Sequence, residues 1–487
     1  MHSNFDNLDP SDWSAFRAQA HAMLDDMLNY TEKLRERPVW EAASPEIKAN
    51  FHTRLPQQGQ DLATLHHQFM HEILPYSIGN NHPGFMGWVQ GGGTPVGMVA
   101  EMLAAGLNAN VGGREQMPIE VERQILRWMC ELFRFPETAN GLFVTGTSIA
   151  NFIAVVIART TCLGTQVRQH GIPQRRLSAY TSAGAHGCVA KAMDLAGFGT
   201  KALRQIPMNE HYQIDIPLLA EKIREDRAHG YQPFLIVGTA GSVDVGAIDD
   251  LNGLADLADT EQCWFHIDGA YGALGMMSDK IAPRLAGIER ADSIAFDFHK
   301  WGQVPYDAGY ILVRDGAHQL DAFASPANYL KRETRGMAAG SPWPCDLGPD
   351  LSRGFRALKT WFTLNTFGTQ RLGNIMHNTC ELAQYLESRI ATEPKLELLA
   401  PVNLNIVCFR YVGSNNLTVE TLNEMNNELV IQLQESGKVA PSSTMIGSQF
   451  AIRVALVNHR SNRIDIDQLI QSTLDIGNTL FGLTNQT

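Results

Sequence analysis

Short apolar runs alternate with longer amphipathic segments through the middle of the chain. The short runs have the length and composition of buried strands and cover residues 179–181, 233–237, 263–267 and 293–298. Helical spacing of apolar residues lies between them, near 187–196 and 251–259. Strands that alternate with helices predict βα units around a mostly parallel sheet. Ligands bind such sheets outside the carboxyl ends of the strands, so polar residues just after these runs are the candidates for a site.

The two ends of the chain follow different patterns. Apolar residues between Trp13 and Leu28 recur at helical spacing after Asp9, a candidate cap, and a second helix is expected near 61–73. This helical arm can pack on a partner subunit or on its own large domain. Beyond residue 370 the pattern predicts a helix over 372–390, then strands over 404–411 and 450–457 around a helix at 419–435. We expect a helical N-terminal arm with a pocket-forming loop (1–95), a large domain (96–369) and a small α+β C-terminal domain (370–487).

Composition narrows the class of protein. A chain of 487 residues that is 44% hydrophobic and 18% charged can bury a large globular core. Its formal net charge of −12 argues against a nucleic-acid or anionic-membrane partner. The 7 cysteines are scattered without a CxxC pair, which argues against a disulfide framework or a zinc ribbon. The N-terminus is polar and no apolar run approaches membrane-spanning length, so we expect an untargeted protein of the reducing cytoplasm.

Lys300 is the residue that most needs an explanation. The apolar run 293–298, interrupted only by Asp297, ends just before it, and His299 and Trp301 flank it. A lysine among aromatic groups is partly desolvated, which lowers its pKa and makes the amine a better nucleophile toward carbonyls. An exposed loop lysine is the ordinary alternative, and the polar residues at neighbouring strand ends argue against it.

Other segments are candidates for the same site. Asp268, His186 and the segment Thr239 to Ser242 each follow a strand-like run, so these polar groups converge on one edge of the predicted sheet. Gly146, Thr147 and Ser148 form a small polar turn that opens a helix, where backbone N–H groups and hydroxyls favour an anion. The glycine-rich stretch 79–97 carries aromatic and polar residues that either line a pocket or belong to an ordinary linker.

Two kinds of centre could use these groups. His186, His266, Asp268 and His299 could ligate a metal, but that reading leaves Lys300 and the hydroxyl-bearing turn without a role. A cofactor that needs a reactive lysine, a carboxylate for a pyridinium nitrogen, a stacking ring and a phosphate cup uses them all. Pyridoxal 5'-phosphate has these four requirements, and we expect it to be the cofactor, with no metal.

Four segments resemble one known family. HIDGAYG (266–272), FDFHKW (296–301), VTGTSIAN (144–151) and SAGAHGCVAKA (182–192) are similar to the group II pyridoxal-phosphate decarboxylases, which include the aromatic-amino-acid, glutamate and cysteine sulfinate decarboxylases. The segment NYTEKLRERPVW and the later FRALKTWFTLNTFG resemble the family in order and spacing. The resemblance implies the α/β type I aminotransferase-like fold and a homodimer with active sites at the subunit interface.

The resemblance also assigns roles. It implies that Lys300 forms a Schiff base with the cofactor, that Asp268 keeps the pyridine nitrogen protonated and that His186 stacks on the ring. The matching phosphate contacts and the small residue beneath the ring are Gly146, Thr147, Ser148, His299 and Ala270. Tyr329, in PANYL on a mobile loop, matches the tyrosine that protonates the product carbon, which favours an amine as product.

The substrate is narrowed by departures from the family. Where aromatic-amino-acid decarboxylases share an aromatic-Pro-Thr segment, this chain has Trp88, Val89 and Gln90. These residues, with His82 and with Arg353 as a carboxylate ligand, are the expected substrate pocket. The sequence therefore predicts a carboxy-lyase of amino-acid (carboxylic acid) metabolism that converts an aromatic or large apolar L-amino acid to its amine and carbon dioxide. The alternatives are an acidic substrate (glutamate, aspartate or cysteine sulfinate), or an aldehyde synthase or aminotransferase on the same fold.

Overall fold

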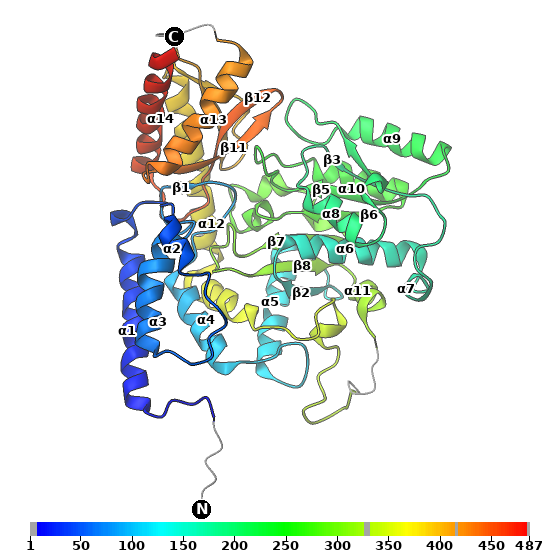
Figure 1. Cartoon of the computed structure of the whole chain (residues 1–487). Coiled ribbons are helices and arrows are strands. Elements are labelled where there is room, and N and C mark those ends of the chain that lie inside the picture. The colour runs from blue at the N-terminus through cyan, green and yellow to red at the C-terminus, as the bar shows by residue number, and fades with distance from the viewer. Residues whose placement is uncertain (1–6, 326–331, 414–416, 485–487) are drawn as a thin grey trace, which may run out of the picture.

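A large mixed β-sheet forms the centre of the computed structural model, which describes residues 7–325, 332–413 and 417–484 (Figure 1). The strand order is β2-β8-β7-β6-β5-β3-β4, in which β7, β6, β5, β3 and β4 run parallel and β8 is antiparallel to both of its neighbours. In chain order the strands are β2 (Asn140–Val144), β3 (Leu177–Ser182), β4 (Leu203–Ile206), β5 (Gln232–Thr239), β6 (Trp264–Asp268), β7 (Ser293–Asp297) and β8 (Gly309–Val313). This is the α/β fold that the alternating pattern predicts.

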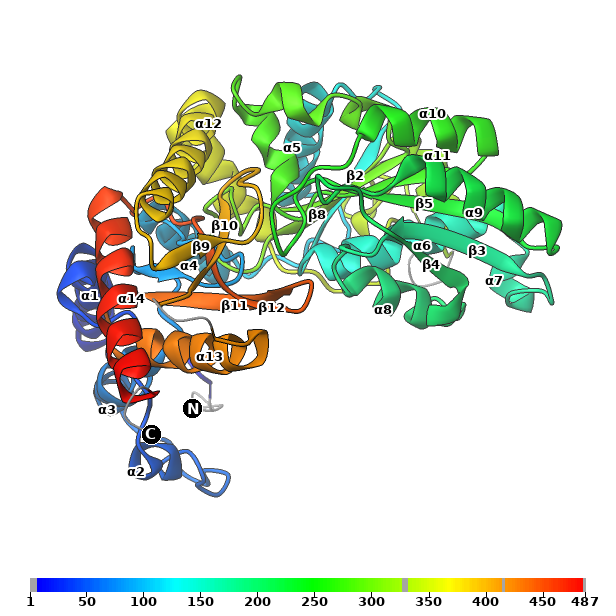
Figure 2. The same cartoon turned by 90° about the horizontal axis from the view of Figure 1, so that it is seen from above.

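Helices cover both faces of this sheet because successive side chains of a strand point to opposite sides. In β2, Leu142 and Val144 join the apolar cluster around α6 and α8, whereas Phe143 joins the cluster that includes α5, α9 and α10. Figure 2 shows α5 and α10 on one side of the strands and α6 and α8 on the other. The bounds are α5 (Met117–Phe133), α6 (Thr147–Leu163), α7 (Val167–His170), α8 (Cys188–Leu195), α9 (Ile216–Ala228), α10 (Leu251–Glu261) and α11 (Gly316–Phe323).

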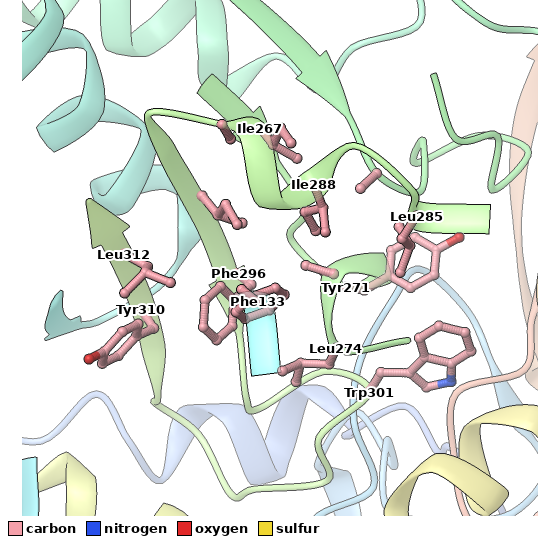
Figure 3. Packing of buried hydrophobic residues seen from close by; sticks show 14 of the residues in the cluster. Phe133, Ile267, Tyr271, Leu274, Leu285, Ile288, Phe296, Trp301, Tyr310 and Leu312 are labelled. Atoms are coloured by element: carbon pink, nitrogen blue, oxygen red, sulfur yellow. The ribbon is translucent and has the colours of Figure 1, made fainter. Parts of the chain in front are cut away.

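Aromatic side chains fill the core beneath the end of β7. Phe296 packs on Phe133 with ring centroids 5.1 Å apart and on Tyr310 at 5.4 Å (Figure 3). Trp301 is fully buried beside Tyr271 and its indole N–H donates to Thr379 Oγ1 at 3.1 Å. These buried rings fix the chain on both sides of Lys300.

A second, smaller sheet has the strand order β1-β11-β12-β10-β9. Its strands are β1 (Phe85–Met86), β9 (Leu396–Leu398), β10 (Ile406–Tyr411), β11 (Ala440–Ile446) and β12 (Gln449–Ala455), and its helices are α12 (Arg356–Ala391), α13 (Val419–Glu435) and α14 (Arg463–Thr484). Neighbouring strands are antiparallel except β1, which pairs in parallel with β11. The α+β pattern predicted for the C-terminal region is present, with α13 at its predicted bounds.

The N-terminal region consists of helices at the edge of the molecule (Figure 1). They are α1 (Trp13–Glu32), α2 (Pro45–Ala49), α3 (Leu62–Gln68) and α4 (Pro95–Leu107). Asp12, not Asp9, caps α1, because its carboxylate accepts the N–H groups of Ser14 and Ala15. α1 has no buried residue along its 20 residues, so its own chain leaves its apolar stripe largely uncovered.

The connections between these regions bear on the expected three-part division, which stays a proposal. α12 begins sixteen residues before the predicted helix at 372–390 and is interrupted at Gly368, where the backbone is non-helical with φ 69°. β1, although N-terminal in sequence, lies in the small sheet. Among the described helices, none is long and apolar enough to cross a membrane.

Candidate active site

A cavity of about 440 Å³ opens at the carboxyl ends of the parallel strands, as expected for this class of sheet. Most of the residues singled out from the sequence line it: Trp88, Val89, Gln90, Gly146, Thr147, Ser148, His186, Asp268, Ala270, His299 and Lys300. Thr239 and Val243 also line it, together with residues that the sequence analysis did not assign to the site, among them Cys188, Asp297 and Tyr306.

Lys300 lies at the floor of this cavity and is held by a carboxylate. Its Nζ is 2.9 Å from Asp297 Oδ2, and its side chain is 23% exposed. Burial by itself lowers the pKa of this amine, but the attraction of Asp297, with help from Asp268, outweighs it, so the pKa of Lys300 is raised above its ordinary value. The expectation of a lowered pKa is therefore wrong for the protein without a cofactor, because it considered desolvation and left out the neighbouring charge.

The turn before α6 forms one end of the cavity. Gly146 is the N-cap of α6, a helix of 17 residues, and the Thr147 N–H donates to Asp297 Oδ1 at 2.8 Å. β8 packs closely here: a Cβ on Gly309 would lie 2.4 Å from Gly146 Cα, so only glycine allows the strand to approach the turn. The turn therefore presents the N-terminal end of a long helix, with its hydroxyls, to the cavity.

Asp268 lies at the opposite end, where β6 stops. It is 5% exposed and accepts hydrogen bonds from Asn151 Nδ2 at 2.9 Å and from the Ala270 N–H at 3.1 Å. The Cys188 thiol donates to the same carboxylate at 3.6 Å. Burial and the nearby carboxylate of Asp268 raise the pKa of that thiol to about 12, so it stays protonated and acts as a donor.

The two histidines differ in their surroundings. His186 is exposed at the cavity edge and its Nδ1 accepts the Cys188 N–H at 3.2 Å. His299 is buried; its Nδ1 accepts the Ala308 N–H at 2.9 Å, and its Nε2 lies 3.5 Å from Asp297 Oδ2. Burial lowers the pKa of His299. A neutral ring that accepts at Nδ1 carries its proton on Nε2, which makes it a hydrogen-bond donor near Asp297.

The glycine-rich stretch 79–97 forms a wall of the cavity, so it lines a pocket and is not an ordinary linker. A Cβ on Gly91 would lie 2.4 Å from the carbonyl oxygens of His299 and Lys300, so this stretch packs directly on the backbone that carries the lysine. Trp88, Val89 and Gln90, which come directly before Gly91, line the mouth of the cavity, and Trp88 is 51% exposed. Its backbone is tied to the small sheet through Ser442 Oγ, which accepts the Trp88 N–H at 3.1 Å.

A buried arginine behind this wall was not predicted. Arg453 of β12 donates to the carbonyl oxygens of Val243 and Asp244, to Trp88 O at 3.2 Å and to Ser442 Oγ at 3.1 Å. Its only sequence signal is a single charge within the otherwise apolar strand 449–455. Because its donors already reach backbone and hydroxyl oxygens, Arg453 supports the shape of the mouth.

Two of the predicted residues that the structure describes do not join this cavity. Arg353 is buried elsewhere and donates to Val111 O, Glu122 Oε2 and Phe143 O at 2.9 to 3.0 Å, so it is a structural ion pair and its assignment to the substrate pocket is wrong. His82 does not line the cavity either; its Nδ1 accepts the Gly84 N–H, and burial lowers its pKa. Tyr329 lies outside the described residues.

The described residues fit pyridoxal 5'-phosphate on structural grounds. Thr147 Oγ1 and Thr239 Oγ1 are buried in the cavity wall without a hydrogen-bond partner in the described part of the chain, and a bound polar group would satisfy them. The amine of Lys300, the carboxylate of Asp268 and the helix terminus between Gly146 and Ser148 meet the cofactor's other demands. A search for groups of three or more His, Cys, Asp or Glu arranged to hold a metal ion found none in the part of the chain that the structure describes.

Comparison with known proteins gives a consistent result. Residues 45–412 match the family model of the pyridoxal-dependent decarboxylase conserved domain. An aromatic-L-amino-acid decarboxylase of Bacillus atrophaeus is 32% identical over 459 residues, covering 93% of this chain and 94% of that protein. An L-2,4-diaminobutyrate decarboxylase of Rhizobium meliloti is 28% identical over 415 residues, covering 84% and 80%. The crystal structure of Oryza sativa TDC with PLP and tryptamine superposes with a TM-score of 0.88 at 22% identity, covering 97% and 100%, and it shares the fold.

Proposed function

The chain belongs to the pyridoxal-dependent decarboxylase family and is a pyridoxal-phosphate-dependent amino-acid decarboxylase, and we propose that its substrate is an aromatic L-amino acid, which it converts to the amine and carbon dioxide. The observation that carries this proposal is the cavity itself. It combines Lys300, Asp268 and the α6 terminus at its floor with Trp88 and Val243 at its mouth.

We propose these roles for the residues of the floor. Lys300 would hold the cofactor through its amine, Asp268 would face the pyridine nitrogen, and His186 and Ala270 would lie against the two faces of the ring. The phosphate would lie at the turn Gly146–Ser148, where Thr147 Oγ1 needs a partner and His299 offers an N–H. When bound, the cofactor supplies an electron-accepting ring that takes up the electron pair left when carbon dioxide departs.

The chain's own residues prepare this chemistry. Asp268 keeps a fixed position, because the Asn151 amide and the Ala270 N–H donate to it. A negative carboxylate at that place favours a protonated ring nitrogen. Asp297 holds the Lys300 ammonium inside the cavity. Its carboxylate is placed to accept the ammonium proton when the amine reacts. Trp88, Val89 and Tyr306 shield the mouth from water on one side.

The lining favours an aromatic side chain over an acidic one. Lys300 is the only lysine or arginine among the described residues that line the cavity. A substrate with a second carboxylate needs a cation that is free to pair with it, since an unpaired buried charge is costly. Arg453 is close to the mouth but donates to protein oxygens. The aromatic relative from Bacillus atrophaeus supports the same preference.

We propose that the active enzyme is a homodimer in the cytoplasm. Trp13 (56% exposed) and Phe16 (42%) of α1 and Leu103 (47%) and Leu107 (59%) of α4 present apolar surface on helices that lie at one edge of the molecule. Large apolar side chains exposed on such helices favour an interface, and twofold pairing is the commonest way to cover them. All 7 cysteines are free, which is consistent with a reducing compartment.

The test is to load the purified protein with pyridoxal phosphate and incubate it separately with each common amino acid, while measuring carbon dioxide and identifying the organic product by mass spectrometry. We expect amine from tyrosine, tryptophan or dopa. Turnover of glutamate, aspartate or cysteine sulfinate alone would contradict the argument from the mouth and leave the cofactor assignment intact.

The same assay distinguishes a decarboxylase from an aldehyde synthase or aminotransferase. Tyr329, proposed as the proton donor to the product carbon, predicts amine as the main product. Replacement Tyr329→Phe should lower amine yield and raise aldehyde and ammonia. An unchanged product ratio would remove Tyr329 from the mechanism.

A further inference from the structure

A chain of buried hydrogen bonds runs away from the cavity behind Asp268. Asn151 Nδ2 donates to Asp268 Oδ2 at 2.9 Å, and Asn151 Oδ1 lies 2.8 Å from His266 Nε2. His266 Nδ1 lies 2.8 Å from Ser293 Oγ, which accepts the Trp264 indole N–H at 2.9 Å, and 3.2 Å from the Ser293 carbonyl oxygen. The side chains come from three neighbouring elements, α6, β6 and β7, and His266 pairs directly with Ser293 in the sheet register. Together these four groups behind Asp268 form one continuous line.

One arrangement of protons satisfies every group along this line, whereas the other would place the His266 proton on Nδ1, toward the Ser293 carbonyl oxygen, and leave Asn151 Oδ1 without a donor. An ionised carboxylate only accepts, so the Asn151 amide must turn its nitrogen toward Asp268 and its oxygen toward His266. An amide oxygen also only accepts, so His266 must carry its proton on Nε2. The Trp264 indole only donates, which leaves the Ser293 hydroxyl proton free to donate to the bare Nδ1 of His266.

Burial supports the same arrangement. His266 and Asn151 are each 1% exposed and Ser293 is 0% exposed, so water does not compete for these bonds. Burial lowers the pKa of His266 to about 4, which keeps the ring neutral at physiological pH. A neutral ring has one N–H, and its alternative tautomer would point two acceptors, Nε2 and Asn151 Oδ1, at each other.

We propose that His266 is a positioning residue that acts through Asn151: its Nε2–H fixes the orientation of the Asn151 amide, which holds Asp268 ionised and directed at the ring nitrogen of the bound cofactor. The inference rests on the proposed role of Asp268. If His266 cannot donate, the Asn151 amide is free to rotate and present its oxygen to the carboxylate. The carboxylate then loses one of its three donors and favours the protonated pyridine nitrogen less.

The first test measures cofactor affinity in pairs. Wild type, His266→Phe and His266→Gln are titrated with pyridoxal phosphate and with its carbocyclic analogue, in which C–H replaces the ring nitrogen. We expect His266→Phe to bind pyridoxal phosphate about tenfold more weakly and the analogue as wild type does. His266→Gln keeps an N–H donor at the matching position and should restore most of the affinity.

A matched control separates this role from general stability. Tyr180 of β3, two strands away from β6 in the same sheet, is also buried and hydrogen-bonded, to Ser178 and Asp226, but it does not line the cavity. Tyr180→Phe should leave both affinities unchanged. Equal weakening of both ligands by His266→Phe would show a merely structural role and overturn the proposal, as would no change in either.

A second measurement does not depend on the folding of His266→Phe. In wild type labelled with ¹⁵N-histidine, the His266 ring, assigned by comparison with His266→Gln, should show the neutral Nε2–H tautomer without any cofactor; an Nδ1–H tautomer would overturn the proposal. Ser293→Ala, which lets Nδ1 take the proton, should weaken pyridoxal phosphate about threefold. Failure of wild type to bind pyridoxal phosphate would instead refute the proposed function, while the tautomer result would stand.

Discussion

Two buried aspartates at the ends of adjacent strands, Asp268 on β6 and Asp297 on β7, have opposite surroundings. Asp268 is surrounded by neutral donors, namely an amide, a backbone N–H and a thiol. Asp297 pairs with the Lys300 ammonium and with the N–H group that opens α6. The partners of Asp268 can stay in place when a cofactor enters, whereas the partners of Asp297 are the groups that the cofactor itself needs. An aspartate therefore serves as a fixed support at the end of β6 and as an exchangeable partner at the end of β7.

The largest effect is expected from removing the reactive partner of Asp297. Lys300→Ala should abolish the visible absorbance of the lysine-bound cofactor and lower the decarboxylation rate by a factor on the order of a thousand or more, since the nucleophile is lost. Absorbance spectra and mass spectrometry after borohydride reduction measure the attachment. Lys191→Ala, at an exposed position on α8, is the control and should behave as wild type. Unchanged colour in Lys300→Ala would contradict the assignment.

Neutralising the fixed aspartate should have the next largest effect. Asp268→Asn keeps the shape of the side chain but removes the charge that favours a protonated ring nitrogen, so the rate should fall by roughly a hundredfold to a thousandfold. Single-turnover release of carbon dioxide measures this step apart from product release. A loss of less than tenfold would mean that the charge of Asp268 is not needed.

Neutralising Asp297, the exchangeable aspartate, should make the Lys300 amine more reactive toward the cofactor. Because the attraction of Asp297 raises the pKa of Lys300, Asp297→Asn should lower that pKa and leave more neutral amine at a given pH. Capture of pyridoxal phosphate should then be about tenfold faster near neutrality, equivalent to a shift of about one pH unit. The rate of colour development as a function of pH measures it. If the midpoint of this pH dependence is unchanged in Asp297→Asn or moves to higher pH, Asp297 is not what raises the pKa of Lys300.

The smallest effect is expected from a hydroxyl at the helix terminus. Thr147 Oγ1 has no hydrogen-bond partner among the described residues, so Thr147→Val should change the free energy of unfolding by less than about 0.5 kcal/mol. It should weaken pyridoxal phosphate a few-fold and leave pyridoxal, which lacks the phosphate, unaffected. Thermal unfolding and paired titrations measure both. Equal weakening of the two ligands would place the hydroxyl away from the phosphate.

The site residues that could be predicted from sequence are those whose position is determined by their neighbours in the chain. Asp268 and Lys300 each follow an apolar run, and Gly146 to Ser148 open a helix, so a single stretch of chain contains both the residue and the reason for its position. The parallel order of the strands then brings these stretches to one edge of the sheet. This is why the fold and the floor of the cavity followed from the pattern.

What could not be predicted depends on contacts between distant segments. The partner Glu122 of Arg353 lies 231 positions away, so a buried structural arginine and a substrate ligand look alike in sequence. Asn151 meets His266 across 115 positions. Arg453 reaches Trp88 O across 365 positions. The raised pKa of Lys300 was missed for a different reason: Asp297 is only three residues away, but the conformation that brings the two side chains together is set by the tertiary packing.

The two-residue strand β1 has a consequence for the order in which the protein is made. Phe85 and Met86 pair with Ala440 and Pro441 of β11, and the Trp88 N–H reaches Ser442 across 354 positions. During synthesis, the strands and helices that place Lys300 emerge from the ribosome well before residue 440, whereas β1, just before Trp88, has no strand to pair with until then. The substrate mouth is thus completed after the floor of the active site, and a nascent chain stopped before β11 would present the floor with β1 still unpaired.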